Sequence, residues 1–206
     1  MKFFLILFLI SPVLLLAEWI EPPNRSSKGY RVPTADYLPV LPQDHGSHPE
    51  YGIEWWYWVG HLNAVDSGKK FGFQSTIFRL AGDPVESRQS SNIHFGNQNL
   101  FLLHCALSDL GEGKYFHHER VVREGWQASA SRETLQLAVG GMKVSLLEDG
   151  TGHEVITRYP GGVKLELTLH PTKPIISFGD RGLSRKGSDP ASVSWYWSYT
   201  RIQAKG

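Results

Sequence analysis

One stretch of the chain, Asp44 to Leu62, limits most strongly what this sequence can fold into. It reads DHGSHPEYGIEWWYWVGHL and holds three of the nine histidines and three of the seven tryptophans. Its second half predicts a β-strand, because aromatic and β-branched residues suit a pleated, half-buried surface. Side chains alternate along a strand, so Glu54, Trp56 and Trp58 share one face. Trp55 lies on the other face, which is also aromatic, so we expect both faces to be buried.

Shorter strands are expected along the rest of the chain. Runs of alternating polar and apolar residues are separated by turns rich in Gly, Pro and Asp. These runs are 71–80, 100–107, 114–122, 135–139, 142–146, 155–159, 163–169 and 192–202. Outside the first 17 residues we find no apolar repeat of helical period. The sequence therefore predicts an all-β sandwich or antiparallel barrel. The expected number of strands, about nine or ten, is enough to close a small barrel that holds one small ligand.

The first residues predict an export signal. Met1 and Lys2 carry the positive charge, and residues 3–17 form an apolar run of 15 residues that is short for a membrane span. Ser11 and Pro12 within the run also disfavour a permanent transmembrane helix, although an uncleaved anchor is the alternative. We expect cleavage after Ala17 and a location in the periplasm or outside the cell.

The remaining residues divide into a lead-in and one domain. Residues 18–40 are rich in proline and predict an extended segment with little secondary structure. Residues 41–206 then form the β-barrel domain. The 21 Lys and Arg residues are interspersed with 20 Asp and Glu residues, so no surface for nucleic acid is expected. Cys105 is the only cysteine, which excludes an intrachain disulfide, and in an apolar strand we expect its thiol to be unreactive.

The aromatic stretch also carries a family resemblance. Asp44-His45-Gly46-Ser47-His48-Pro49 followed by Glu54-Trp55-Trp56-Tyr57 resembles the signature of the carotenoid 1,2-hydratase family. This lipocalin-like group also includes the AttH-type exported proteins. Further blocks resemble the family in the same order, over residues 73–79, 104–109, 116–120, 171–174, 182–187 and 195–201. The resemblance extends over the chain from Leu41 onward.

The resemblance implies two consecutive lipocalin-like barrels with a ligand cleft at and between them. The present sequence ends at Gly206, just after the last block of the first barrel. We therefore expect the second barrel to be absent, either through truncation or because this is a one-barrel variant. Some residues assigned to catalysis in the hydratases lie in the second half, so the activity does not simply carry over. An unpaired first barrel would be able to form a homodimer through the surface that the second barrel normally covers.

Glu54 and Asp44 are the candidate acids, and His45 is the third candidate catalytic residue. Hydration of a trisubstituted alkene needs a strong proton donor and aromatic faces that stabilise a carbocation. A carboxylic acid desolvated by tryptophans would have a raised pKa and could stay protonated. The alternative for Glu54 is a structural ion pair with Arg79 or Arg201.

The candidate ligand-binding residues are mainly aromatic and come from several of the blocks. They are His48, Trp55, Trp56, Tyr57, Gln74, Arg79, His104, Trp195 and Trp197. Two alternatives stay open: tryptophans along a strand can belong to the core, and polar residues before it can hydrogen-bond the backbone of a turn. The histidine spacing matches no known metal motif, so we expect neither a metal nor another cofactor.

Two functions are compatible with these features. The first is an exported binder of an apolar or amphipathic small molecule, such as a lipid or isoprenoid, acting beside components of an AttH-type ABC transport system. The alternative is a hydratase that adds water to an isoprenoid double bond by acid catalysis. Export weighs against carotenoid hydration as such, because those substrates lie in membranes beside cytoplasmic pathways.

Overall fold

The computed structural model describes residues 19–84 and 99–206. The predicted signal peptide over residues 1–17 lies outside these ranges and stays a prediction. Within them, no helix has both the length and the apolar composition that a membrane crossing requires.

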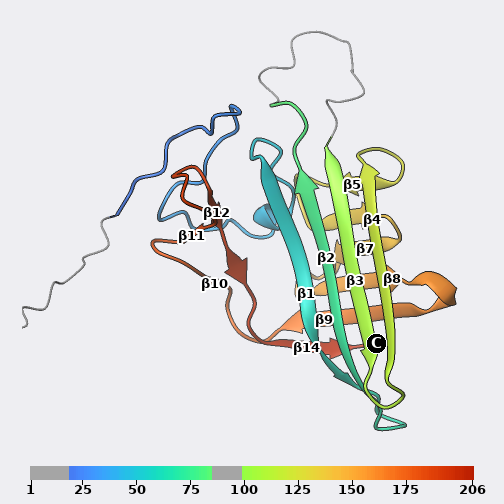
Figure 1. Ribbon diagram of the computed structural model, residues 1–206. Coiled ribbons are helices and arrows are strands. Elements are labelled where there is room, and N and C mark those ends of the chain that lie inside the picture. Colours follow the sequence, from blue (N-terminus) through green and yellow to red (C-terminus); the bar gives the residue numbers. More distant parts are fainter. Residues whose placement is uncertain (1–18, 85–98) are drawn as a thin grey trace, which may run out of the picture.

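The described chain folds into two large antiparallel sheets and two small two-stranded ones, and it has almost no helix (Figure 1). The first sheet has the order β1-β2-β3-β4 and contains β1 (Ile53–Asn63), β2 (Lys70–Leu80), β3 (Leu100–Asp109) and β4 (Lys114–Arg123). The second has the order β14-β9-β8-β7-β6-β5 and contains β5 (Ala128–Ala130), β6 (Gln136–Val139), β7 (Met142–Leu146), β8 (His153–Arg158), β9 (Lys164–Pro171) and β14 (Ile202–Lys205). The predicted all-β, lipocalin-like antiparallel fold is confirmed.

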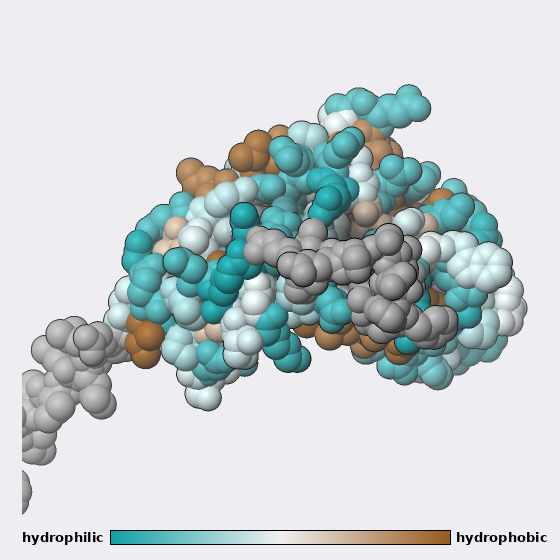
Figure 2. Space-filling view, turned by 90° about the horizontal axis from the view of Figure 1, so that it is seen from above, coloured by the Kyte–Doolittle hydropathy of each residue, from teal (hydrophilic) through white to brown (hydrophobic). Residues whose placement is uncertain are grey.

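The core lies where the two sheets cross face to face (Figure 1). Alternation along β3 places Phe101, Leu103, Cys105 and Leu107 on the inner face, and all four are buried. From the second sheet, the inner residues include Leu137, Val139, Met142, Val144, Val155 and Leu167. Seen from above, the outer surface is mostly hydrophilic, and its hydrophobic residues form small separate patches (Figure 2).

The expected single strand over 192–202 is wrong. In its place the chain forms β12 (Val193–Trp195), β13 (Trp197–Ser198) and β14, and each pairs with a different strand. β12 pairs with β11 (Leu183–Arg185), β13 with β10 (Ile176–Ser177), and β14 with β9. A run of aromatic residues suits all three pairings equally, so its composition does not reveal the change of partner. We call residues 172–201 the excursion, since they leave the second sheet after β9 and return at β14.

The excursion lies beside β1 and holds the lead-in (Figure 1). The Trp195 indole donates a hydrogen bond to the Thr34 carbonyl at 2.8 Å. The Tyr37 ring stacks on Trp195 with a centroid distance of 4.2 Å. The chain then passes through the short 3-10 helix η1 (Gln43–His45) into β1. The polar residues before β1 are thereby held between the first sheet and the excursion.

The two faces of β1 differ in their burial. On the inner face Trp58 is only 7% exposed, whereas Val59 on the outer face is 67% exposed. The expectation that both faces are buried is therefore wrong for the second half of the strand. The excursion covers only the first half, where Tyr196 approaches Trp55 and hydrogen-bonds Tyr57.

Candidate functional site

A cleft of about 1010 Å³ runs along β1, where the two sheets are not joined by strand pairing. In the described chain β1 pairs only with β2, and β14 only with β9, so the seam between β1 and β14 stays open. The inner wall is apolar and includes Trp56, Trp58, Phe73, Leu169 and Ile202. Residues of the excursion and of the lead-in line the remaining side. The arrangement gives a concave, largely aromatic space with polar groups at a few points.

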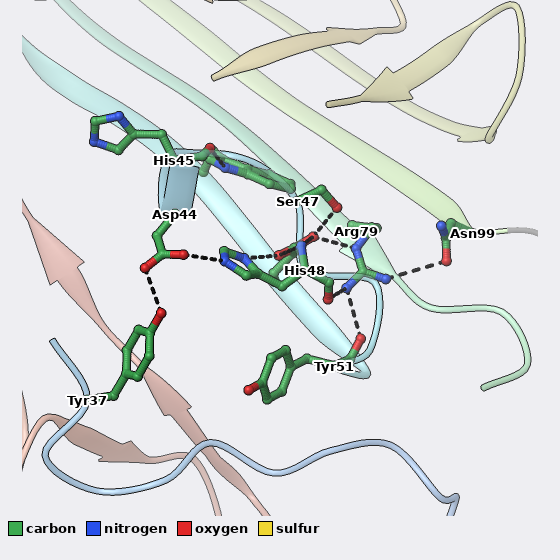
Figure 3. A network of polar contacts seen from close by, with 10 residues as sticks. Tyr37, Asp44, His45, Ser47, His48, Tyr51, Arg79 and Asn99 are labelled. Atoms are coloured by element: carbon green, nitrogen blue, oxygen red, sulfur yellow. Dashed lines mark hydrogen bonds and ion pairs between the residues drawn. The ribbon is translucent and has the colours of Figure 1, made fainter. Parts of the chain in front are cut away.

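A polar network borders this cleft at the start of β1 (Figure 3). The His48 ring lies between two carboxylates, with Nε2 at 3.2 Å from Asp44 Oδ1 and Nδ1 at 3.2 Å from Glu54 Oε2. The Tyr37 hydroxyl donates to Asp44 Oδ2 at 2.8 Å. The network thus extends from the lead-in, through η1, to the first residues of β1.

Arg79 on β2 anchors the other end of the network. Its side chain is fully buried, and Nε lies 2.5 Å from Glu54 Oε1. The guanidinium also donates to the carbonyls of His48 and Tyr51, at 2.9 and 2.8 Å. Glu54 and Arg79 are direct cross-strand partners, which places them on one face of the hairpin. Of the two partners considered for Glu54, Arg79 is the one that the structure provides.

The charges in this network contradict the raised pKa values expected for the candidate acids. Burial alone would raise the pKa of Glu54, but hydrogen bonding from His48 and the charge of Arg79 outweigh it, so its pKa lies below the ordinary value. Burial likewise raises the pKa of Asp44, and donation from the Val40 amide and Tyr37 brings it below the ordinary value. For His48, burial opposes the charge, yet the two carboxylates raise its pKa. The network therefore favours two carboxylates around an imidazolium rather than a neutral acid.

His45 belongs to a separate group inside the cleft. Its ring points away from the Asp44–His48 pair (Figure 3) and lies edge-on to His153 at a centroid distance of 5.3 Å. Its Nε2 is 3.2 Å from the Tyr199 hydroxyl. The Trp58 indole donates to His153 Nδ1 at 3.5 Å. The predicted site did not include His153 or Tyr199, although alternation from the buried Val155 would have placed His153 on the inner face.

The predicted site residues fall into two sets. The cleft is lined by most of them, namely Asp44, His45, His48, Glu54, Trp55, Trp56, Tyr57, Trp195 and Trp197. Gln74 and His104 instead lie on the outer face of the first sheet, where His104 pairs with Glu119 at 3.0 Å. Alternation along β2 and β3 directs them away from the core, so the structure does not bring them to this cleft. Arg79 lies behind the lining, within the Glu54 network.

Several aromatic rings form the outer wall of the cleft. Trp195 and Trp197 stack with a centroid distance of 5.7 Å. The Lys186 ammonium lies over Trp55 and Tyr196, at 5.2 and 5.0 Å from the ring centroids. Over residues 19–84 and 99–206, no three His, Cys, Asp or Glu side chains are grouped in a way that could hold a metal ion.

Comparison with known proteins identifies the family. Residues 32–206 match the family model described as AttH-like. No curated protein matches the chain. The fold is similar to the crystal structure of a candidate AttH protein from Nitrosomonas europaea, with a TM-score of 0.66 and 29% sequence identity. The match covers 82% of this chain and 49% of that one, so the present chain spans about half the length of that protein. With its two large antiparallel sheets and a family match over residues 32–206, the chain belongs to the AttH-like family.

Proposed function

We propose that the protein binds an apolar or amphipathic small molecule, a lipid or an isoprenoid, in the cleft along β1. The observation that carries this proposal is the cleft itself, about 1010 Å³ in volume with an inner wall of Trp56, Trp58, Phe73 and Leu169. Small-molecule sites are typically concave and mostly apolar, with a few polar groups that set the orientation of the ligand. The cleft has these properties.

Unpaired polar atoms in the lining also support the presence of a ligand in the cleft. Four buried side-chain polar atoms have no hydrogen-bond partner among the described residues: Ser26 Oγ, His45 Nδ1, Ser194 Oγ and Trp197 Nε1. All four belong to residues that line the cleft. Buried polar groups are normally hydrogen-bonded, since leaving them unpaired costs free energy. Because these atoms are shielded from solvent, a ligand would supply the missing partners only if the lining shifts on binding.

Binding can be tested by displacement of N-phenylnaphthylamine, a probe whose fluorescence rises in apolar sites. We expect saturable probe binding to the purified protein and displacement by long-chain lipids. Trp56→Leu, in the inner wall, should weaken probe binding several-fold. Trp126→Leu serves as the matched control, because Trp126 is 99% exposed and lies outside the cleft. Absence of saturable probe binding would reject the proposal.

We further propose that this binding takes place outside the cytoplasm, beside components of an AttH-type ABC transport system. The support for this location is the charged and apolar sequence of residues 1–17 and membership of the AttH-like family. Cell fractionation with an antibody against the protein tests it, and a wholly cytoplasmic protein would contradict it. We also propose a homodimer that forms through the surface normally covered by a second barrel in the family. Light scattering at micromolar concentration tests this, and a monomer would refute it.

Hydration of an isoprenoid double bond is the second candidate, and the site supports it less well. Protonation of an alkene needs a neutral acid, whereas the pKa values of both Glu54 and Asp44 lie below their ordinary values. The feature in its favour is the aromatic lining, which would stabilise a carbocation. Mass spectrometry of an acyclic polyene incubated with the protein would detect added water. Product formation that is abolished in both Glu54→Gln and Asp44→Asn would favour the hydratase over the binder.

A further inference from the structure

The cleft contains a second polar group that is distinct from the Glu54 network. His45 comes from η1, His153 from the start of β8, and Tyr199 from the end of the excursion. The His45 and His153 rings meet edge-on at 5.3 Å, and both lie 5.9 Å from the Tyr199 ring. Trp58 packs edge-on to His153 at 6.4 Å. Three separate segments of the chain thus place polar atoms at one point of an apolar wall.

Both imidazoles have a nitrogen without a partner in the described part of the chain. An indole nitrogen can only donate, so His153 Nδ1 accepts the bond from Trp58 Nε1 at 3.5 Å. The proton of the neutral ring is then on Nε2, and no described residue accepts it. His45 uses Nε2 toward the Tyr199 hydroxyl at 3.2 Å, and its Nδ1 is buried and unpaired. The unused donor that a ligand can reach is therefore His153 Nε2–H, whereas His45 Nδ1 is covered by its neighbours.

This polar group carries no net charge at neutral pH. Burial is the main cause that lowers the pKa of His153 to about 4, and it also lowers the pKa of His45. The cations around the cleft belong to other parts of it: Arg79 is paired with Glu54, the His48 ring lies between Asp44 and Glu54, and Lys186 lies over Trp55 on the outer wall. Lys28 and Arg31 line the cleft from the lead-in. An anionic group brought to His153 would lose its hydration without gaining a countercharge.

We infer that His153, packed beside His45 and Tyr199, recognises a neutral oxygen, a hydroxyl or a carbonyl, on an otherwise apolar ligand. This inference rests on the proposed function and assigns the chemical class of the ligand. The Nε2–H of His153 donates to the oxygen of the ligand, while the carbon skeleton lies along Trp56 and Trp58. A hydrocarbon would leave the Nε2–H of His153 unpaired, and a carboxylate would be desolvated without a cation beside it.

The test compares three small probes of similar shape: butylbenzene, phenylbutanol and phenylbutanoate. Each competes with N-phenylnaphthylamine for the wild-type protein and for His153→Phe, which keeps a ring but removes its hydrogen bonds. We expect the affinity ratio of phenylbutanol to butylbenzene to fall about tenfold in His153→Phe, as loss of a buried hydrogen bond predicts. His153→Gln, which retains an N–H donor, should recover part of the ratio. His117→Phe, on the exposed side of β4, is the matched control and should leave the ratio unchanged.

Each result has a defined meaning. Unchanged butylbenzene affinity in His153→Phe shows that the variant is folded with an intact cleft, so the change in ratio is specific to the oxygen. If the ratio is the same in wild type and His153→Phe, the inference is overturned while the proposed function stands. If phenylbutanoate binds wild type as tightly as phenylbutanol, the assignment of a neutral oxygen is overturned. If neither the probe nor any competitor binds the wild-type protein, the proposed function fails and the inference fails with it.

Discussion

Replacement of Arg79 by methionine tests whether the polar network holds the fold together at the start of β1. The guanidinium is fully buried and makes the ion pair with Glu54 together with two hydrogen bonds to main-chain carbonyls. In Arg79→Met the Glu54 carboxylate stays buried with only Ser47 and His48 as partners. Breaking a buried pair by removing one partner costs about 3–5 kcal/mol of unfolding free energy. We expect a loss in this range.

The single variant Glu54→Met and the double variant with Arg79→Met distinguish the contribution of the ion pair from that of side-chain packing. Glu54→Met should cost a similar amount, because it leaves the Arg79 charge buried without its carboxylate. The double variant removes both charges, so its cost should be smaller than the sum of the two single costs by about 2 kcal/mol. Arg158→Met makes the same substitution at an exposed position at the end of β8 and should change stability by less than about 0.5 kcal/mol.

Urea unfolding followed by tryptophan fluorescence measures these differences. The slope of the unfolding free energy against urea should be unchanged among the variants, because the same surface is exposed on unfolding. Two results would refute the reasoning. One is a cost below about 1 kcal/mol for Arg79→Met. The other is strict additivity of the two single costs in the double variant, which would mean that the charges act independently.

Three further predictions concern other parts of the molecule. The pKa of His153 is about 4 in the folded protein and 6.5 in the unfolded chain, so the unfolded state binds more protons between these two pH values. The unfolding free energy should therefore fall by about 3 kcal/mol as the pH is lowered through this window. His153→Gln should remove that part of the loss in urea unfolding measured at several pH values, and an unchanged pH dependence would contradict the assignment. At Gly179 φ is +93°, and an added Cβ would lie 2.0 Å from the Leu183 carbonyl oxygen. At Gly68 φ is +65° and nothing lies within 4 Å, so Gly68→Ala should lower the unfolding free energy by only about 1–2 kcal/mol. Gly179→Ala should lower it by more than twice as much. Equal melting temperatures for these two variants would refute this. Burial raises the pKa of the Cys105 thiol, which is 4% exposed, so it should react with Ellman's reagent only in denaturant, and rapid reaction of the native protein would be the contrary result.

The strands and the first part of the site were predictable because their determinants are local. Alternation and turn residues predicted the strand at 142–146 with the bounds that the structure has. The turn after β1 also fixes the antiparallel register, which in the structure opposes Glu54 to Arg79 and so selects this partner over Arg201. His48 lies six residues before Glu54, so their contact is also local.

The second polar group of the cleft depended on contacts that no local pattern reveals. His153 and Tyr199 meet only because β8 lies opposite β1 and because the excursion returns its last residues to the seam. The aromatic run around Trp195 looks like one strand, yet its backbone changes partner twice. The raised pKa expected for Glu54 was wrong for a related reason. Burial was correctly anticipated, but the number of hydrogen-bond donors around the carboxylate was not.

The excursion has a consequence for how the protein behaves in concentrated solution. β1 is eleven residues long and lies at the end of its sheet, so its main-chain groups on one side have no partner strand. Such an edge is a template on which a strand of another molecule can add, and natural proteins often cover it. The side chains of Tyr196 and Ser198 lie against Tyr57, which places a bulky irregular segment beside this edge. The segment that shapes the cleft therefore also shields the first half of β1 against the addition of a strand from another molecule.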